Sequence, residues 1–191
     1  MGRRRQVSDL QITEAAREVF LQNGPKAPVA LVAKKLGVST ATLFQRAGSK
    51  TQLMLMALVQ SAPSPTTELQ RGVQTEVPVR QQLGRVLFEL NEYLGTVISG
   101  SLTLRAARIE AELPEPRPST LRRLLTRWLE DAAAASLLDV RDAKTTADVL
   151  IGTLESRHIH AYMQQQTYSA RQHRDYIRSL IDVVFPPQAG A

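Results

Sequence analysis

The sequence predicts an all-α protein of about nine helices, and three observations point to this fold class. Apolar residues recur at helical spacing in several stretches, most regularly over residues 83–98. All ten prolines fall in proposed connections, in first helical turns or after the last helix, where helices tolerate them. No run alternates apolar and polar residues, and no residue pair predicts a hairpin turn.

The first helix is predicted over residues 8–22. Ser8 and Gln11 stand at the spacing of a capping box, in which each side chain bonds the backbone N–H of the other residue. Asn23, which Gly and Pro follow, ends the helix. The apolar stripe that is expected to face the core consists of Ile12, Ala16, Val19 and Phe20.

Residues 29–48 predict two short helices joined by a tight turn. Gly37 ends the first helix, because glycine adopts the positive φ that a sharp exit requires. Ser39 is a favourable N-cap for the second helix, which is expected over residues 40–46. A helix this short does not persist alone, so its outward face is expected to serve a partner. The pattern is that of a helix-turn-helix, whose second helix enters the DNA major groove.

A further helix is predicted over residues 50–60, with Ser49 and Gln52 as a second capping box. Lys50 then lies in the first turn, where the helix dipole disfavours a cation unless a phosphate oxygen lies beside it. The alternative for Lys50 is a solvated surface lysine. The residues expected to face DNA bases are Thr40, Ala41, Phe44 and Gln45. The residues expected to hold DNA phosphates are Ser39, Thr42, Arg46 and Lys50.

Positive charge is concentrated at the N-terminal end of the chain. Residues 1–50 hold nine Lys and Arg against three acids, which accounts for the whole net charge of +6. A basic head on a neutral body is typical of a phosphate-binding module attached to another domain. The chain also starts with a basic arm, which is expected either to reach a phosphate or the minor groove or to act as a solubilising tail. This arm consists of Arg3, Arg4 and Arg5.

These segments resemble the N-terminal domain of the tetracycline-repressor (TetR) family, closely over residues 8–58 and beyond that only in helical layout and at the C-terminal end. The resemblance implies an all-helical, dimeric transcription regulator, usually a repressor that a small molecule releases from its operator. It rests on residues 12–20, 32–33, 36–38, 42–44 and 49–53.

Three residues depart from the family pattern. Phe44 replaces the usual tyrosine, so the hydroxyl contact that the family makes there is absent. Pro28 stands where a threonine cap is common, and Ala30 stands where an arginine often contacts DNA. These departures concern the DNA contacts and leave the expected fold unchanged.

The domain boundary is expected near residue 60. Residues 1–60 form the predicted three-helix, helix-turn-helix DNA-binding domain, and residues 61–191 form a helical effector-binding and dimerisation domain. Residues 61–78, which contain three prolines, are expected to be a loop or linker. The helices predicted after it cover residues 79–99, 102–113, 119–137 and 142–165, and a last helix begins at Ser169 with Gln172 as a third capping box.

The end of the last helix is unusually apolar, since seven of the ten residues 176–185 are apolar. That surface is wider than one core-facing stripe requires. We therefore expect a homodimer in which the last two helices of each copy form a four-helix interface, and an operator that is an inverted repeat. The residues expected at this interface are Leu154, Ile177, Leu180, Ile181 and Val184.

An effector pocket is expected in the second domain, between the helices that begin near residues 79, 102, 119 and 142. Large rings with a few polar groups suit a mostly apolar pocket for an organic ligand, and the family resemblance implies such a pocket. The alternative is that the rings only fill the core. The candidate pocket residues are Phe88, Asn91, Tyr93 and Trp128.

Other functions find little support. Without cysteine the chain has no disulfide or thiolate metal site, which is compatible with the expected cytoplasmic location. His158 and His160 lie about 200° apart on a helix, so they cannot bind one metal ion together. No phosphate loop, nucleophile elbow or dinucleotide fingerprint occurs. We expect no cofactor, no metal, no catalytic residue and no membrane segment. The alternatives are a helical ligand- or protein-binding module without an operator and, last, an enzyme.

Overall fold

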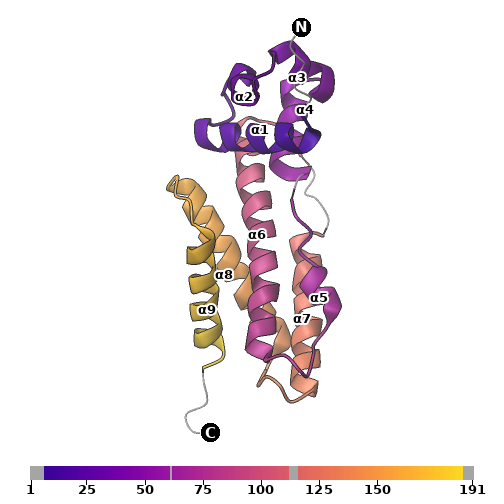
Figure 1. Cartoon of the computed structure of the whole chain (residues 1–191). Coiled ribbons are helices and arrows are strands. Elements are labelled where there is room, and N and C mark those ends of the chain that lie inside the picture. Colours follow the sequence, from indigo (N-terminus) through magenta and orange to yellow (C-terminus); the bar gives the residue numbers. More distant parts are fainter. Residues whose placement is uncertain (1–6, 61, 112–115, 187–191) are drawn as a thin grey trace. The chain divides into compact units, whose positions relative to one another are not determined.

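The computed structural model describes residues 7–60, 62–111 and 116–186, and every regular element in these ranges is a helix (Figure 1). The predicted all-α fold class is therefore confirmed for the described part of the chain. Among the helices that the structure describes, none combines the length and the apolarity that a membrane span requires.

The helices form two compact units. The first unit comprises residues 1–62 and 96–114, and the second comprises residues 63–95 and 115–191. One helix, α6 (Val79–Ala106), supplies residues to both units. The sequence placed residues 96–114 with the second domain, whereas the structure groups their described part with the helix-turn-helix.

The first unit is built around α1 (Asp9–Asn23). This helix packs against α2 (Val29–Leu36), α4 (Lys50–Leu55) and the π-helix η1 (Met56–Gln60), and α3 (Thr40–Ala47) packs against α2 and α4. The core of the unit is a continuous apolar cluster whose larger members are Phe20, Leu43, Leu53, Leu58 and Leu104.

Serine caps begin several helices as the sequence predicts. Reciprocal capping boxes are present at Ser8 of α1 and at Ser169 of α9 (Ala170–Val184). The Ser49 side chain accepts the backbone N–H of Gln52 at 3.1 Å. Pro28 precedes α2 without a side-chain cap, as its departure from the family pattern implies. The caps fix where the helices of the first unit begin.

The helix predicted over residues 50–60 changes from α to π geometry at Met56. At this place η1 meets α6 closely, because a Cβ on Gly100 would lie 1.8 Å from the Leu58 carbonyl oxygen. Only glycine fits such an approach of one backbone to another. Close packing of α6 against η1 therefore explains why residue 100 is a glycine, and the sequence pattern did not reveal this contact.

The two helices predicted over residues 79–99 and 102–113 are wrong, because the structure has the single helix α6 in their place. Two hydroxyls near the expected break hydrogen-bond to carbonyls of the same helix and do not interrupt it. Ser99 Oγ donates to the Thr96 carbonyl, and Thr103 Oγ1 donates to the Ser99 carbonyl. The helix ends at Ala106, before Arg108 adopts a φ of 58°.

The second unit packs α7 (Pro118–Ala134) against α8 (Ala143–Met163), with α5 (Thr67–Arg71) beside α7 (Figure 1). The prediction of a loop over residues 61–78 is wrong at α5, a short helix whose Leu69 is buried. The largest buried residues of α6 in this unit are Leu83, Leu87, Leu90, Tyr93 and Leu94.

Arginine side chains form ion pairs between helices of the second unit. Arg122 on α7 pairs with Asp148 at 3.2 Å and with Glu155 at 2.5 Å, both on α8. Arg80 on α6 binds the Asp182 carboxylate of α9 and donates to the Phe185 carbonyl. These ion pairs fix the faces along which α7 meets α8 and α6 meets α9.

Candidate nucleic-acid interface and ligand-binding region

The candidate recognition helix α3 is held from its inner side. Leu43 is fully buried and Ala47 is nearly so, which anchors this short helix in the apolar cluster. Gly37 adopts a φ of 68° and ends α2, and the Ser39 side chain caps α3 by accepting the Thr42 N–H at 3.1 Å. The local sequence therefore determines both the turn and the orientation of α3.

The outer face of α3 carries the residues predicted to meet bases. Thr40, Ala41 and Gln45 are exposed, and the Phe44 ring is 41% exposed. The ring leaves apolar surface on the outer face of α3, and burial of that surface against a partner would be favourable. The geometry brings these side chains together on one accessible face, as the helical spacing predicts.

The predicted phosphate-binding residues differ in whether their polar groups are already bonded within the protein. Ser39 Oγ is occupied as the N-cap and lies 2.9 Å from Thr42 Oγ1. Lys50 is in the first turn of α4, with Nζ 5.8 Å from the Phe20 ring centroid. Among the described residues Lys50 has no anionic partner, so its charge is available to a phosphate.

Arg46 is bound within the protein. One guanidinium nitrogen donates to the Val7 carbonyl and another binds the Asp9 carboxylate, at the start of α1. The structure therefore shows Arg46 as a link between α3 and α1, whereas the sequence pattern predicts a phosphate contact. The two roles exclude each other only if Arg46 keeps both intramolecular bonds on DNA.

Two further basic positions bear on this surface. Lys34 is exposed in the last turn of α2, near the turn into α3, and the spacing argument did not select it. Its neighbour Lys35 pairs with Glu18 at 2.6 Å. The predicted arm, Arg3, Arg4 and Arg5, lies outside the described residues.

The four candidate pocket residues divide into three that lie in the core and one that lines a groove. Asn91, Tyr93 and Trp128 are buried in the core of the second unit, at 0%, 2% and 3% exposure. The Tyr93 hydroxyl donates to the Pro116 carbonyl at 2.8 Å, and Trp128 Nε1 is buried without a partner among the described residues. Phe88 is partly buried and lines a groove of 660 Å³ between α5, α6 and α9.

Asn91 is the centre of a buried polar network that links three helices. Its carbonyl oxygen lies 3.0 Å from His158 Nε2 on α8, and its amide nitrogen lies 3.0 Å from His173 Nδ1 on α9. Because an amide oxygen only accepts and an amide nitrogen only donates, His158 Nε2 carries a proton and His173 Nδ1 does not. Gly95 makes room for the ring, since a Cβ there would lie 2.6 Å from His158 Cε1.

Burial keeps both imidazoles neutral. It lowers the pKa of His158 to about 4, and repulsion from Arg157 and from the protonated form of His173 acts in the same direction. Burial also lowers the pKa of His173, and the nearby Glu92 carboxylate opposes that shift. Neutral rings match the hydrogen bonds, and within the described residues no group of three potential ligands is placed to bind a metal.

Arg157 on α8 completes this part of the unit. Its guanidinium carbon lies 4.0 Å from the Tyr168 ring centroid and 3.9 Å from the Tyr176 ring centroid, so it is stacked between two aromatic faces. Stacking of this kind is favourable for a partly desolvated arginine. No local sequence pattern reveals the network or this stack, because the partners come from segments that are distant in the chain.

The residues predicted at the dimer interface are divided between core and surface. Leu154, Ile177 and Ile181 are buried within the chain itself, and Leu180 and Val184 are partly buried. The apolar residues that α8 and α9 expose are others, namely Val149, Ile159, Met163 and Val183.

Comparison with known protein families finds a match within the first unit. Residues 12–57 match the family model described as bacterial regulatory proteins, tetR family. This segment covers α1 from Ile12 onward, α2, α3, α4 and the first two residues of η1. No curated protein matches the sequence at a significant level.

Solved structures resemble the chain over almost its whole length. A structure titled for the control of antibiotic production by bacterial hormones is 24% identical, with a TM-score of 0.63 and coverage of 92% of this chain and 96% of that one. The regulator PfmR of Thermus thermophilus is 16% identical, with a TM-score of 0.64 and coverage of 95% and 100%. The regulator SCO0520 of Streptomyces coelicolor is 20% identical, with a TM-score of 0.57 and coverage of 95% and 100%. At these identities the likeness concerns the fold.

Proposed function

Since the chain is a DNA-binding regulator of the tetR family through residues 12–57, we propose that it represses transcription from an inverted-repeat operator until a small organic effector releases it. The observation that carries the proposal is the exposed face of α3. Its polar and aromatic side chains lie on a helix that Leu43 anchors in the core. A face of this kind is suited to reading base edges in the major groove.

The proposed contacts follow from the exposed groups. Gln45 pairs with adenine through two hydrogen bonds, and Ala41 and Phe44 contact thymine methyl groups. Lys50, which has no anionic partner among the described residues, holds a phosphate at the N-terminus of α4. Thr40 lies beside Phe44 and completes the base-facing surface.

The test measures DNA binding by fluorescence anisotropy, using fragments from the region upstream of the gene and a salt titration. Lys50→Ala is expected to weaken all sequences alike and to reduce the salt slope by about one unit. Lys144→Ala is the matched control, because Lys144 also lies in the first turn of a helix but belongs to α8. If both lysine variants behave as the wild type does, Lys50 holds no phosphate.

Gln45→Ala tests the base contact itself. It is expected to relax the preference at one base position and to cost about 1–3 kcal/mol of binding free energy there. Gln22→Ala, at an exposed position of α1, is the control. An unchanged sequence preference for Gln45→Ala would remove Gln45 from the recognition surface. Failure of every upstream fragment to bind better than unrelated DNA would favour the alternative, a helical binding module without an operator.

The proposed homodimer is supported by the outer face of α8. Val149, Gly152, Ser156, Ile159 and Met163 follow one another at alternating spacings of three and four, so they lie on one side of the helix. A Cβ on Gly152 would meet nothing within 4 Å, which shows that this side is open in the single chain. A second copy packed here would bury the stripe. An inverted-repeat operator requires the two α3 helices of the dimer to lie about 34–36 Å apart, or at a multiple of that distance.

Sedimentation tests the dimer. Val149→Arg is expected to yield monomers, because a charge at this end of the stripe would be buried without a partner in the dimer. Ile181 is unsuitable for this test, since it is 5% exposed within the chain and a charge there would disturb the subunit. A Val149→Arg protein that still sediments as a dimer would exclude this face of α8.

The proposed control by an effector has a structural route. The helix α6 supplies residues 79–95 to the second unit and residues 96–106 to the first, so a change in its position affects the core that supports α3. One structural relative is titled for control by a bacterial hormone, which agrees with regulation by a small molecule. The effector must bind the DNA-free state better than the DNA-bound state, because equal affinities shift nothing.

A further inference from the structure

The groove between α5, α6 and α9, which we name the α6–α9 groove, combines an apolar floor with arginines on its walls. Phe88, Ile177 and Ile181 form the floor. Gly84 adds depth, because a Cβ there would already lie 3.9 Å from Ile181 Cδ1 and the position carries no side chain. The cavity volume of 660 Å³ is within the range of small-molecule sites.

The acidic residues of the groove are already engaged. Glu68 pairs with Arg71 at 2.6 Å and lies 3.3 Å from Arg85 Nε. The carboxylate of Glu89 accepts the backbone N–H of Glu68 at 2.8 Å, and Asp182 binds Arg80. Two of the three carboxylates that line the groove are therefore paired with arginines, and the third, Glu89, is hydrogen-bonded to the backbone.

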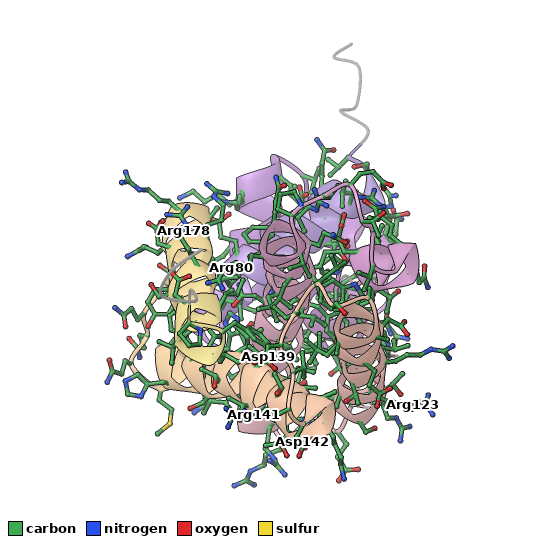
Figure 2. All side chains as sticks on the ribbon, turned by 90° about the horizontal axis from the view of Figure 1, so that it is seen from below. Arg80, Arg123, Asp139, Arg141, Asp142 and Arg178 are labelled. Atoms are coloured by element: carbon green, nitrogen blue, oxygen red, sulfur yellow. The ribbon has the colours of Figure 1, made fainter. Side chains whose placement is uncertain are left out.

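The arginines are only partly engaged. Arg174 has no ion-pair partner among the described residues, and Arg178 has only a contact of 3.8 Å with Asp175. Arg85 Nε is buried and makes no hydrogen bond of good geometry, although Glu68 is near. Figure 2 shows Arg80 and Arg178 on the α9 side of this unit and Arg123 on the α7 side. Hydrogen-bonding capacity for an anion thus remains beside an apolar floor.

We propose that the α6–α9 groove binds an organic anion, with a carboxylate or sulfonate held by Arg174 and Arg178 and an aromatic or aliphatic body on the floor. Charge-assisted hydrogen bonds to an anionic group are stronger than neutral ones, and the apolar body gains from burial beside Phe88. This inference rests on the proposed function in one respect: it takes the ligand of the groove to be the effector, and so assigns the effector to the class of organic anions.

The first experiment measures binding to the full-length protein without DNA. The probe is 1-anilinonaphthalene-8-sulfonate, which joins an apolar ring system to an anion and fluoresces when its rings are buried. We expect saturable binding that naphthalene-1-carboxylate displaces and that neutral naphthalene-1-methanol displaces far less. Equal displacement by the neutral and the anionic compound would overturn the assignment of an anion site.

Three variants locate the site. Gly84→Leu should abolish probe binding by filling the groove, and it exchanges glycine for a better helix former. Arg174→Gln combined with Arg178→Gln should weaken binding by about tenfold or more. Arg123→Gln, an exposed arginine on α7, is the matched control and should bind as the wild type does (Figure 2). Undiminished binding in Gly84→Leu, with an unchanged circular dichroism spectrum, would exclude this groove.

A second measurement separates the site from its role in regulation. Naphthalene-1-carboxylate is added to the protein–DNA complex, and release of DNA is followed by anisotropy. Binding of the compound in the groove with release of DNA supports both inferences. Binding without release keeps the groove as an anion site and removes its role as the effector site. Loss of the groove assignment, with operator binding intact, leaves the DNA-binding function unaffected.

Discussion

The two units of the chain use their polar side chains in opposite ways. In the first unit the residues of α3 that have functional groups, such as Gln45, lie on the surface, and the core cluster is apolar. In the second unit Gln82 and Asn91 are buried and bond to other elements. The Gln82 amide bonds the backbone of Gln74 and Val77, and Asn91 joins two histidines. The difference teaches that the polar groups on the outer face of α3 stay accessible in the first unit, whereas Gln82 and Asn91 specify internal packing in the second.

The largest effect on stability is expected from Gly100→Ala in the first unit. The new methyl group would lie 1.8 Å from the Leu58 carbonyl oxygen, which belongs to the backbone and cannot turn away. We expect a loss of about 4 kcal/mol or more in the free energy of unfolding, above the usual cost of overpacking. Chemical denaturation measures it.

The control is Gly95→Ala in the second unit, where the three atoms nearest to the new methyl group all belong to the His158 ring, the closest at 2.6 Å. A side chain can move, so the expected loss is smaller, about 1–3 kcal/mol. Equal losses in the two variants would show that the approach of α6 to η1 is not the tighter one.

The second prediction concerns the buried network. Asn91→Ala leaves His158 Nε2 and His173 Nδ1 without their partner, and it is expected to lower the free energy of unfolding by about 2–4 kcal/mol. Thr103→Val is the comparison in the first unit, because the buried Thr103 hydroxyl bonds the Ser99 carbonyl of its own helix at 2.8 Å. Its expected cost is about 0.5–1.5 kcal/mol. A larger loss for Thr103→Val would reverse the contrast between the units.

The third prediction concerns pH. The pKa of His158 is lowered to about 4 in the folded protein, so between pH 6.5 and 4 the unfolded chain binds more protons than the folded one. Stability that is fully present above pH 6.5 is therefore lost as the pH falls toward 4, by about 2–3 kcal/mol. The lowered pKa of His173 acts in the same direction.

His158→Gln isolates this contribution from that of the carboxylates. Its amide has no proton to gain, so its free energy of unfolding should fall less than that of the wild type between pH 6.5 and 5. Thermal or urea unfolding at several pH values provides the comparison. Parallel pH profiles for the two proteins would mean that His158 is not kept neutral by burial.

The sequence predicted the first unit far better than the second, for physical reasons. Caps such as Ser8, Ser39 and Ser49 act within a few residues, so they are visible in the chain, and the structure has these caps in place. The Asn91 network joins residues that are 67 and 82 positions apart, and no local pattern reveals it. The prediction that the helix breaks near Gly100 is wrong for the same reason. The close contact that explains this glycine comes from Leu58, which is distant in the chain.

The smallest effect on stability is expected from Phe44→Ala. The ring is 41% exposed on the outer face of α3, so its removal should change the free energy of unfolding by no more than about 0.5 kcal/mol. The same variant should weaken DNA binding if the outer face reads bases. A large loss of stability with unchanged DNA binding would assign Phe44 to the fold instead of to recognition.

The passage of α6 through both units limits how this protein can be recombined. Leu104, near the end of α6, is 1% exposed in the apolar cluster beneath the helix-turn-helix. In a chimera that exchanges residues 1–62 alone, the new DNA-binding segment would have to pack against Leu104 of the original chain, to which it is not matched. Recombination that preserves both cores has to exchange residues 96–106 together with the head. The segments that build the two cores therefore interleave along the gene and are not two consecutive blocks.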